Sequence, residues 1–507
     1  MQLDLGRALV AIKGIMEITG TPGVSVGIIH QGQTAGTYHL GYRDVQNKVQ
    51  ANDDTRGNNE LGENFSIVDL LSHRTGLSSL DDFWMGVDNV IYLDKSQVLP
   101  TFQTLPLSQP FRESLEYNNW GYEIVAQILE KTANRTISDL LHERVFAPLG
   151  MSRTSTSWES GDDNEAKCYG ILEDLSPVEV ARPALGKGTT MEAAGGIKST
   201  LRDMLTFYKT FMHETNFQFS SGSDASNFSP LKNCRMLTTN HARLPEVSWR
   251  EQGYALGWGR SQLPGKLGRL SGNALFGDCP IVDKGNSSLV LWHHGCMPGS
   301  TSVVYLAPEV ESGVVVLQNS MPVIDTADLI GQLVLEAVLN VQEPNDYVEL
   351  SKKFYDKGVN HLRNLQKELD DSRTPGTKPR PLSAYTGTYW NQPETFFITV
   401  KERAGSLVMA AQGLLSQEYT LQHYQNDSFT WIMPFNEIIR RARSATYYTS
   451  EYYIVNFVDG KGEIDRLAWV MESGLPDNGG RKVFKKGPNP RGSSGAWSLT
   501  KQASDLK

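Results

Sequence analysis

The stretch YNNWGYEIVAQILEK (residues 117–131) passes from a polar start into a helical pattern. Its apolar residues recur at the spacing of one helix face, which predicts an amphipathic helix: Ile124, Val125, Ile128 and Leu129. Just before this pattern, Tyr117 and Asn119 stand two positions apart, so a phenol and an amide can face one cavity at the helix start. Because Tyr389–Asn391 and Tyr424–Asn426 repeat the spacing, the surroundings of Tyr117 must decide its meaning.

Helix-start signals lie on both sides of this stretch. Each pairs a hydroxyl residue with an aspartate three positions later, as in a capping box: Ser66 with Asp69, Thr136 with Asp139, and Thr200 with Asp203. The first opens SIVDLLSHRTGL, where Gly76 suits a helix end, and the second opens a segment that stops at Pro148 and Gly150. The middle of the chain is therefore predicted to be mostly helical.

Strand patterns lie before and after these helices. The run 24–29 and a second run ending near Tyr42 flank Gln31-Gly32, which predicts a β-hairpin. SLVLWHH, TSVVYLA and GVVVLQN follow one another between residues 288 and 319, and TADLIGQLVLEAVLN adds a helix with an apolar stripe from Leu329 to Val338. Strands early and late around a helical middle predict an α/β or α+β sandwich of an antiparallel sheet and helices.

The sequence pattern changes from helical to strand-like after a charged helix expected at residues 349–371. From Leu382 onward, short aromatic or β-branched segments alternate with turns, which predicts a small antiparallel β-barrel or sandwich. We expect four parts, with disorder in the last: a main domain at 1–345, a helix and linker at 346–381, a barrel at 382–487 and a tail at 488–507.

Composition limits the possible partners and the location. The chain has 507 residues, 39% of them apolar and 21% charged, and a net charge of -9. A chain this acidic, without an evident basic face, is not expected to bind nucleic acid or an anionic membrane. It contains no run of 18 apolar residues, and its N-terminus does not read as a secretory signal, so a cytoplasmic location is expected. Four scattered cysteines predict free thiols rather than disulfides or a zinc site.

Two further features contain histidines. His293-His294-Gly295 stands at the predicted end of the LVLW strand, where a donor beside a small residue can line an acyl pocket, although His30-Gln31-Gly32 has the same spacing. His73 lies in LLSHRTGL and could be a general base, but a capping or hydrogen-bonded structural role is the favoured interpretation.

Taken in order, eight motifs resemble those of the serine β-lactamase-like hydrolases, which include class C β-lactamases, penicillin-binding DD-peptidases and related esterases and acyltransferases. They are GTPGVSVGII, GYRDVQNKVQANDDT, LLSHRTGL, YNNWGYEIVAQILE, VFAPLGM, AAGGIKST, GYALGWG and HHGCMPG. The resemblance covers about residues 9–340 and implies a β-lactamase/transpeptidase-like sandwich. Residues 382–486 are similar to the lipocalin-like domain that often follows such enzymes, mainly through AYTGTYW.

The resemblance implies roles for particular residues. In this family the nucleophile is the serine of an S-x-x-K motif, and its lysine helps to take the proton. Tyr117 is expected to relay protons, and Asn119 to hold substrate and lysine. His293 and Gly295 would line the opposite wall, with an oxyanion-hole N–H near Ser300. The partner would be a small acyl substrate, and no metal or cofactor is implied.

The nucleophile motif itself is missing where the resemblance places it. Between DDT (residues 53–55) and LLSHRTGL the chain has RGNNELGENF, so the nucleophile helix expected at about residues 56–64 is absent. The S-x-x-K matches at Ser229, Ser498 and Ser504 lie outside the motif order and are interpreted as accidental. A skipped exon or a faulty gene model explains the gap more simply than a selected rearrangement.

Two functions follow from these observations. The first is a serine hydrolase or acyltransferase that acts on an ester, amide or lactone through an acyl-serine, impaired in the chain as printed. The alternative is a catalytically inactive relative that acts as a binding or regulatory protein. A barrel that carries a ligand is a third possibility, but Trp431, Trp469, Tyr452 and Tyr453 fit a barrel core better.

Overall fold

The computed structural model describes residues 23–30, 33–42, 48–49, 65–157, 164–244, 246, 248–283, 285, 287–472 and 480–490. The chain forms two compact units, Met1–Phe65 and Ser66–Lys507, and each is described by itself. In the first unit, β1 (Gly23–His30) pairs antiparallel with β2 (Gln33–Gly41), which confirms the predicted hairpin. The division into compact units falls only at Phe65, so the bounds of the four parts expected from the sequence stay predictions.

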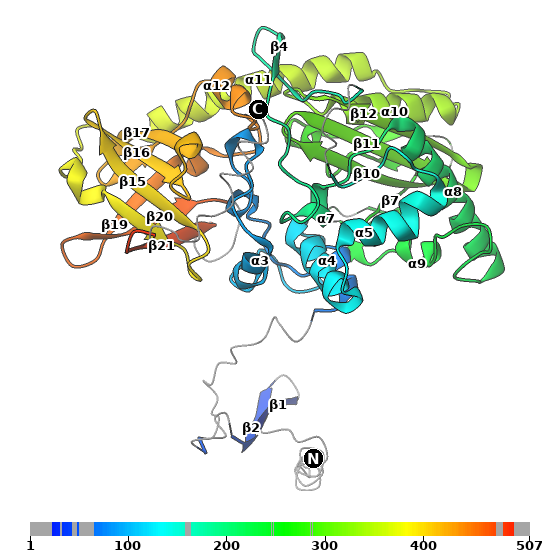
Figure 1. Ribbon diagram of the computed structural model, residues 1–507, viewed down its shortest axis with the longest axis horizontal. Coiled ribbons are helices and arrows are strands. Elements are labelled where there is room, and N and C mark those ends of the chain that lie inside the picture. The colour runs from blue at the N-terminus through cyan, green and yellow to red at the C-terminus, as the bar shows by residue number, and fades with distance from the viewer. Residues whose placement is uncertain are drawn as a thin grey trace. The chain divides into compact units, whose positions relative to one another are not determined.

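The second unit contains a six-stranded antiparallel sheet in the order β12-β11-β10-β7-β6-β5 (Figure 1). Its strands are β5 (Ala242–Arg243), β6 (Gln252–Tyr254), β7 (Gly259–Gln262), β10 (Leu289–Met297), β11 (Ser300–Ala307) and β12 (Ser312–Gln318). The expected strand end at His293-His294 is wrong, because the β10–β11 ladder continues to the pair Met297 and Ser300. The turn between them contains Gly299 with a φ of +98°.

Helices cover both faces of this sheet. Along β11, Val303 and Tyr305 pack with Ala327 and Leu335 of α10 (Thr326–Val338). The alternate residues Val304 and Leu306 pack with Phe211 and Met212 of α8 (Leu201–Ser221). Because successive side chains of a strand point to opposite faces, α10 and α8 lie on opposite sides of the sheet. The predicted α/β sandwich of antiparallel sheet and helices is therefore confirmed.

Shorter elements complete the second unit. The remaining α-helices before the barrel are α2 (Ile67–Leu71), α3 (Lys95–Phe102), α4 (Asn119–Ala133), α5 (Ile137–Leu141), α6 (Ala147–Leu149), α7 (Glu192–Gly195), α9 (Cys234–Leu237) and α11 (Tyr347–Ser372). Other single turns include η1 (Asp81–Phe83), η2 (Val87–Asn89), η3 (His142–Phe146), η4 (Gly272–Leu275) and η5 (Pro308–Val310). Two small sheets join β13 (Ser320–Met321), β3 (Tyr169–Ile171) and β4 (Pro177–Glu179), and separately β8 (Gly265–Lys266) and β9 (Ile281–Val282).

The predicted helix starts agree with the structure, but one predicted end does not. Ser66 and Asp69 form the expected capping box, and Thr136 and Thr200 each cap their helix. Helix α2, however, ends at Leu71 rather than near Gly76. His73 adopts a left-handed φ of 53°, and its ring accepts a hydrogen bond from the backbone of another segment, so a tertiary contact ends the helix early.

The predicted apolar helix faces are also partly wrong. In α4, Ile128 and Leu129 are exposed, whereas Trp120 and Ala126 are buried. In α10, Leu329 is buried, but the rest of the expected stripe is exposed: Ile330, Leu333, Val334 and Val338. The buried face of α10 also contains the polar side chains of Asp328, Gln332 and Glu336, so aliphatic periodicity alone does not identify it.

The C-terminal strands form a closed antiparallel barrel, as expected from their spacing. They are β14 (Gly387–Trp390), β15 (Phe397–Arg403), β16 (Ser406–Ala411), β17 (Glu418–Gln425), β18 (Ser428–Thr430), β19 (Ile454–Asp459), β20 (Ile464–Val470) and β21 (Arg481–Gly487), with α12 (Phe435–Arg440), η6 (Leu382–Tyr385), η7 (Leu415–Gln417) and η8 (Ser450–Tyr453) between them.

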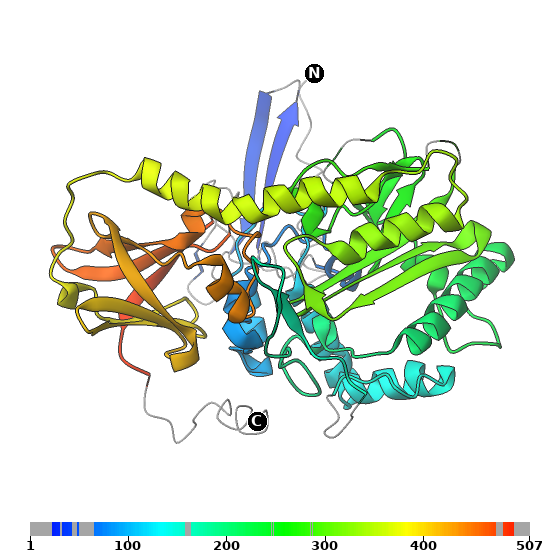
Figure 2. The ribbon, with the colours of Figure 1, turned by 90° about the horizontal axis from the view of Figure 1, so that it is seen from above.

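Helix α11 links the sheet to the barrel. Figure 2 shows this helix, in yellow-green, extending from the sheet side to the barrel. Near its start Phe354 packs with Phe276 and Ile324, and at its end the Leu369 carbonyl accepts a hydrogen bond from the Tyr424 hydroxyl, at 2.9 Å.

Two further predictions concern the state of the cysteines and the presence of membrane-spanning helices. All four cysteines lie in described residues and are free thiols, with Cys168, Cys234 and Cys279 buried and Cys296 exposed. Within the described residues, no helix combines the length and the apolar character needed to cross a membrane.

We predict that Gly299→Ala destabilises the sheet domain by about 2–3 kcal/mol, measured as the free energy of unfolding in urea. A Cβ at this position would lie 2.6 Å from Cys168 Cβ, and the φ of +98° disfavours any side chain. Gly376→Ala is the matched control, because Gly376 has a φ of +76° but open space around it, and it should cost only about 1 kcal/mol. Equal losses in the two variants would contradict this packing.

Candidate active site

Tyr117 and His293 face each other across a group of aromatic rings. Their ring centroids lie 6.1 Å apart, although Tyr117 precedes α4 and His293 lies on β10. His73 lies 4.1 Å from Tyr117 and 5.1 Å from both Tyr122 and Tyr254. We call these five residues the ring cluster. The structure thus brings together the motif that contains Tyr117 and the motif that contains His293.

Asn118 connects the two motif segments that meet here. Its backbone N–H donates to His73 Nδ1 at 3.1 Å, and its side-chain amide donates to the carbonyls of Leu77 and Ser78, at 3.1 and 2.8 Å. Its side-chain oxygen accepts from the Gly121 N–H at the start of α4. Tyr117 and Asn119 flank this residue, so the same contacts fix the place where both side chains emerge.

His73 is a neutral, structural histidine. It is 1% exposed, and burial lowers its pKa to about 3. Because Nδ1 accepts the Asn118 N–H, the proton resides on Nε2, which has no hydrogen-bond partner among the described residues. The lone pair that a general base needs is therefore already occupied, which supports the structural interpretation of His73.

His293 is also neutral and has both ring nitrogens occupied. Its Nδ1 lies 2.7 Å from the His294 carbonyl, which can only accept, so Nδ1 carries the proton. Its Nε2 therefore accepts from the Tyr254 hydroxyl at 2.8 Å. Burial lowers the pKa of His293 to about 4. The imidazole thus contributes an uncharged wall, and it offers no free nitrogen as an acid or base.

Gly295 and Ser300 lie further along the same hairpin. Gly295 pairs with Ser302 in the β10–β11 ladder, and a Cβ at Gly295 would collide with Ser302 Oγ. Ser300 begins β11 and is half-buried. Their assignment to substrate binding stays a prediction.

Tyr117 carries a neutral phenol at physiological pH. Burial raises its pKa to about 12, and the negative charge of Asp81 acts in the same direction. Within the described residues, its hydroxyl group forms no hydrogen bond to a side chain that could take its proton. Tyr117 is thus a neutral phenol, which can take up a proton only after another group has removed its own.

Asn119 is held by a residue that the sequence analysis missed. Its amide donates to both carboxylate oxygens of Asp81 at 3.2 Å, and the Trp84 indole N–H donates to one of them at 2.7 Å. Burial raises the pKa of Asp81 to about 6. Asp81 belongs to no recognisable motif, and only its position a few residues after LLSHRTGL could have drawn attention to it.

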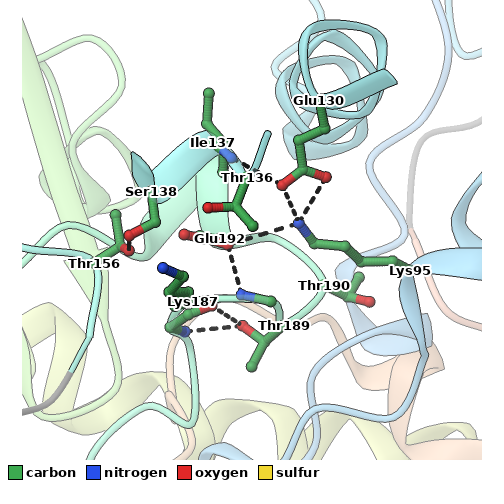
Figure 3. Close-up of polar contacts among 12 residues, drawn as sticks. Lys95, Glu130, Thr136, Ile137, Ser138, Thr156, Lys187, Thr189, Thr190 and Glu192 are labelled. Carbon is green, nitrogen blue, oxygen red and sulfur yellow. Dashed lines mark hydrogen bonds and ion pairs between the residues drawn. The ribbon is translucent and has the colours of Figure 1, made fainter. Parts of the chain in front are cut away.

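A second polar network fixes α4 away from the rings (Figure 3). Lys95 of α3 donates to both carboxylate oxygens of Glu130 on α4, at 2.9 and 3.0 Å, and lies 3.6 Å from Glu192 of α7. Glu130 also accepts the Ile137 N–H, and Glu192 accepts the Gly188 N–H at 2.8 Å. One ammonium group therefore joins three helices and sets the direction of the helix whose start carries Asn119.

The serines of the accidental motifs do not complete the site. Ser229 lies between α8 and α9 and accepts the Leu231 N–H at 3.0 Å, and no hydrogen bond joins it to the ring cluster in the part of the chain that is described. Ser498, Ser504 and the junction at 56–64 lie outside the described residues.

Comparisons with known proteins agree with this architecture. A family model described as Beta-lactamase matches residues 57–339, and one described as a domain of unknown function (DUF3471) matches residues 371–478. Unguisins hydrolase ungD of Aspergillus violaceofuscus is 25% identical over 391 residues, which are 72% of this chain and 64% of that protein. Unguisins hydrolase ungD' of Aspergillus campestris is 21% identical over 337 residues, 65% of this chain and 57% of that protein. The chain thus spans less than two thirds of either relative.

Two solved structures are also similar. The octameric penicillin-binding protein homologue from Pyrococcus abyssi has a TM-score of 0.41 and 17% identity, over 95% of this chain and 100% of that chain. A class C β-lactamase from Rhodobacter sphaeroides has a TM-score of 0.40 and 17% identity, over 66% of this chain and 99% of that chain.

We predict that Asp81→Asn changes how stability depends on pH. Because the folded state raises the pKa of Asp81 from 3.8 to about 6, its contribution is fully present below pH 3.8 and is lost as the pH rises through 6. Between pH 4 and 7 the unmodified chain should therefore lose about 1–3 kcal/mol relative to Asp81→Asn, measured by urea unfolding at each pH. Asp356→Asn, at an exposed position on α11, is the control and should leave the pH dependence of stability unchanged. If Asp81→Asn and the unmodified chain showed the same pH dependence, the raised pKa of Asp81 would be contradicted.

We predict that Lys95→Met lowers the free energy of unfolding by about 2–4 kcal/mol, because it leaves Glu130 and Glu192 without their ammonium partner. Lys353→Met is the control, since its side chain is 64% exposed beside Glu349, and it should change stability by less than about 0.5 kcal/mol. Similar losses from both variants in thermal unfolding would argue against the network.

Proposed function

Because this chain belongs to the β-lactamase family, whose model matches more than half of it, we propose that it is a hydrolase or acyltransferase for an ester, amide or lactone. The contact that carries this proposal is the approach of Tyr117 to His293, with ring centroids 6.1 Å apart. Two side chains from distant parts of the sequence face one another, which supports a site between them.

The proposed reaction runs through an acyl-serine. A serine oxygen attacks the substrate carbonyl, its proton passes through the lysine and tyrosine to the leaving group, and water or another acceptor then releases the acyl group. Tyr117 would pass the proton as a neutral phenol. Asn119, held by Asp81, would position the substrate, and backbone N–H groups near Ser300 would stabilise the oxyanion.

The neutral state of His293 supports the proposed substrate class. Family members with lysine at the third motif present a positive charge that suits an anionic substrate. Here the imidazole is uncharged near neutral pH, because burial lowers its pKa to about 4. An uncharged wall suits an ester, amide or lactone better than it suits a carboxylate-bearing β-lactam.

The chain as printed is proposed to be impaired, because no S-x-x-K motif stands before LLSHRTGL. In a serine protease, loss of the nucleophile lowers turnover on the order of a million-fold. Ser229 does not offer a replacement, since its hydroxyl lies in a turn between α8 and α9.

A non-catalytic relative that binds an acyl compound is the second candidate. The missing motif favours it, and so does His293, whose two nitrogens are both engaged by protein groups. A ligand-carrying barrel is not proposed. Trp431 lies at the centre of an aromatic core, with ring centroids 5.1 Å from Tyr452 and Tyr453 and 5.6 Å from Trp469.

The named relatives fit the proposed reaction class without defining the substrate. Both are called hydrolases of unguisins, and neither reaches 30% identity, so only the hydrolase class is carried into the proposal. A small acyl compound is the proposed partner, and the cytoplasm is the proposed location.

We predict that a fluorophosphonate serine probe does not label the chain as printed. Insertion of an S-x-x-K helix from a relative between Arg56 and Gly57 should create one labelled serine, identified by mass spectrometry. In that inserted chain, Tyr117→Phe should slow labelling about 100-fold, because the proton relay is lost.

The same insertion with alanine in place of the serine is the control. Stoichiometric labelling of the printed chain would refute its proposed impairment. An inserted chain that folds but neither reacts with the probe nor hydrolyses esters, amides or lactones would refute the hydrolase proposal.

A further inference from the structure

The turn that fixes Asn119 is itself bound by the barrel. The backbone N–H of Leu80 donates to a carboxylate oxygen of Glu472 at 3.1 Å. Glu472 follows β20, the strand Ile464–Val470 of the barrel, whereas Leu80 directly precedes Asp81. The Glu472 carboxylate of the barrel therefore binds the residue that directly precedes Asp81, the aspartate that holds Asn119.

A second contact secures the same turn. The guanidinium of Arg443, which follows α12, donates to Asp82 and to the Met85 carbonyl, the latter at 3.3 Å. The side chains of Arg443 and Asp82 are each only 11% exposed. A carboxylate this well buried needs its cation, so Arg443 and Asp82 hold the barrel and the turn together.

The following residues extend this contact toward α3. The side-chain amide of Gln417 accepts the Val87 N–H at 2.9 Å and donates to the Val87 carbonyl at 3.1 Å. Phe83 packs against Phe396 of the barrel, with ring centroids 5.2 Å apart. Figure 1 shows this dark blue segment, which leads into α3, between the barrel and α4.

The turn has a reason to need outside support. Leu80 adopts a left-handed conformation, with φ of 39° and ψ of 51°, and is 2% exposed. For a residue other than glycine, such a conformation costs about 1–2 kcal/mol and persists where surrounding contacts hold it. The Leu80 N–H would also be buried without a partner if Glu472 were absent.

We propose that Glu472 of the barrel is a positioning residue for the candidate active site, which it serves by holding the Leu80–Asp81 turn against Asn119. The route runs from the Glu472 carboxylate to the Leu80 N–H, then through Asp81 to the Asn119 amide and the phenol of Tyr117. The inference rests on the proposed function only in that Tyr117 and Asn119 are taken as members of the site.

Charged groups around Glu472 are consistent with this arrangement. Burial raises the pKa of Glu472 to about 7, and the negative charges of Glu116 and Asp81 act in the same direction. Burial lowers the pKa of Lys482 on β21 to about 8, and the negative charge of Glu472 acts in the opposite direction. A carboxyl oxygen accepts the Leu80 N–H in either protonation state, so the contact does not depend on a narrow pH range.

The test measures ionisation of the residue at position 117 in the full chain, with 3-fluorotyrosine incorporated there and read by fluorine NMR. Its midpoint should lie above that of free 3-fluorotyrosine. Glu472→Ala should lower the midpoint by about 0.5–1 pH unit, because Asp81 is released from the phenol. Asp81→Asn gives the shift for complete loss of the carboxylate.

Glu472→Gln should keep the midpoint within about 0.2 unit of the unmodified chain, because the amide oxygen still accepts the Leu80 N–H. Glu402→Ala, at an exposed position on β15, is the matched control and should have no effect. If Glu472→Ala does not fold, Glu472→Asp replaces it, and a shift in the same direction is expected.

A midpoint that is unchanged in the folded Glu472 variant while Asp81→Asn lowers it would overturn the proposal. No shift in either variant would also overturn it, because Asp81 would then be uncoupled from Tyr117. The measurement requires neither a nucleophile nor turnover, so its outcome is independent of the serine-probe experiment.

Discussion

The candidate site depends on the hydrogen bonds of one buried residue, Asn118, made by both its backbone N–H and its side-chain amide. This residue is 2% exposed and joins three parts of the molecule: the ring of His73, the carbonyls of Leu77 and Ser78, and the first turn of α4. Only a primary amide, as in asparagine or glutamine, can donate twice and accept once without a charge. Because Tyr117 and Asn119 adjoin it, the orientation of the active-site wall follows from the capping of a helix.

Charge is unevenly distributed around this wall. The two histidines of the ring cluster are neutral near pH 7, and Tyr117 keeps its proton, because burial disfavours the charged form of each ring. The negative charge of Asp81 acts on Tyr117, and the Trp84 and Asn119 side chains donate to the Asp81 carboxylate. Among the described residues, the wall contains groups suited to a proton relay but no base to start it, which agrees with the absence of an S-x-x-K motif before LLSHRTGL.

Local signals in the sequence predicted those features that depend on local chemistry. The pairing of Ser66 with Asp69 fixes a helix start within four residues, and the three strands between Leu289 and Gln318 form where the sequence predicts them. Features set by distant contacts were not predictable in this way. Helix α2 stops early because Asn118 binds His73, Ile128 faces outward although its periodicity is helical, and Asp81 gains its role only when Asn119 folds against it. Tyr117 and His293 could be assigned to one site only because the motifs that contain them occur in the order found in the β-lactamase family.

The contact of Arg443 with Asp82 has a consequence for how such chains can diversify. Exchange of one domain for another is tolerated where the groups at the interface between them are exposed and weakly paired. Here the exchange of one half would leave a buried carboxylate without its cation and Phe83 without the ring of Phe396. Recombination at the linker after α11 would therefore be selected against, and the two halves are expected to be inherited as a single unit.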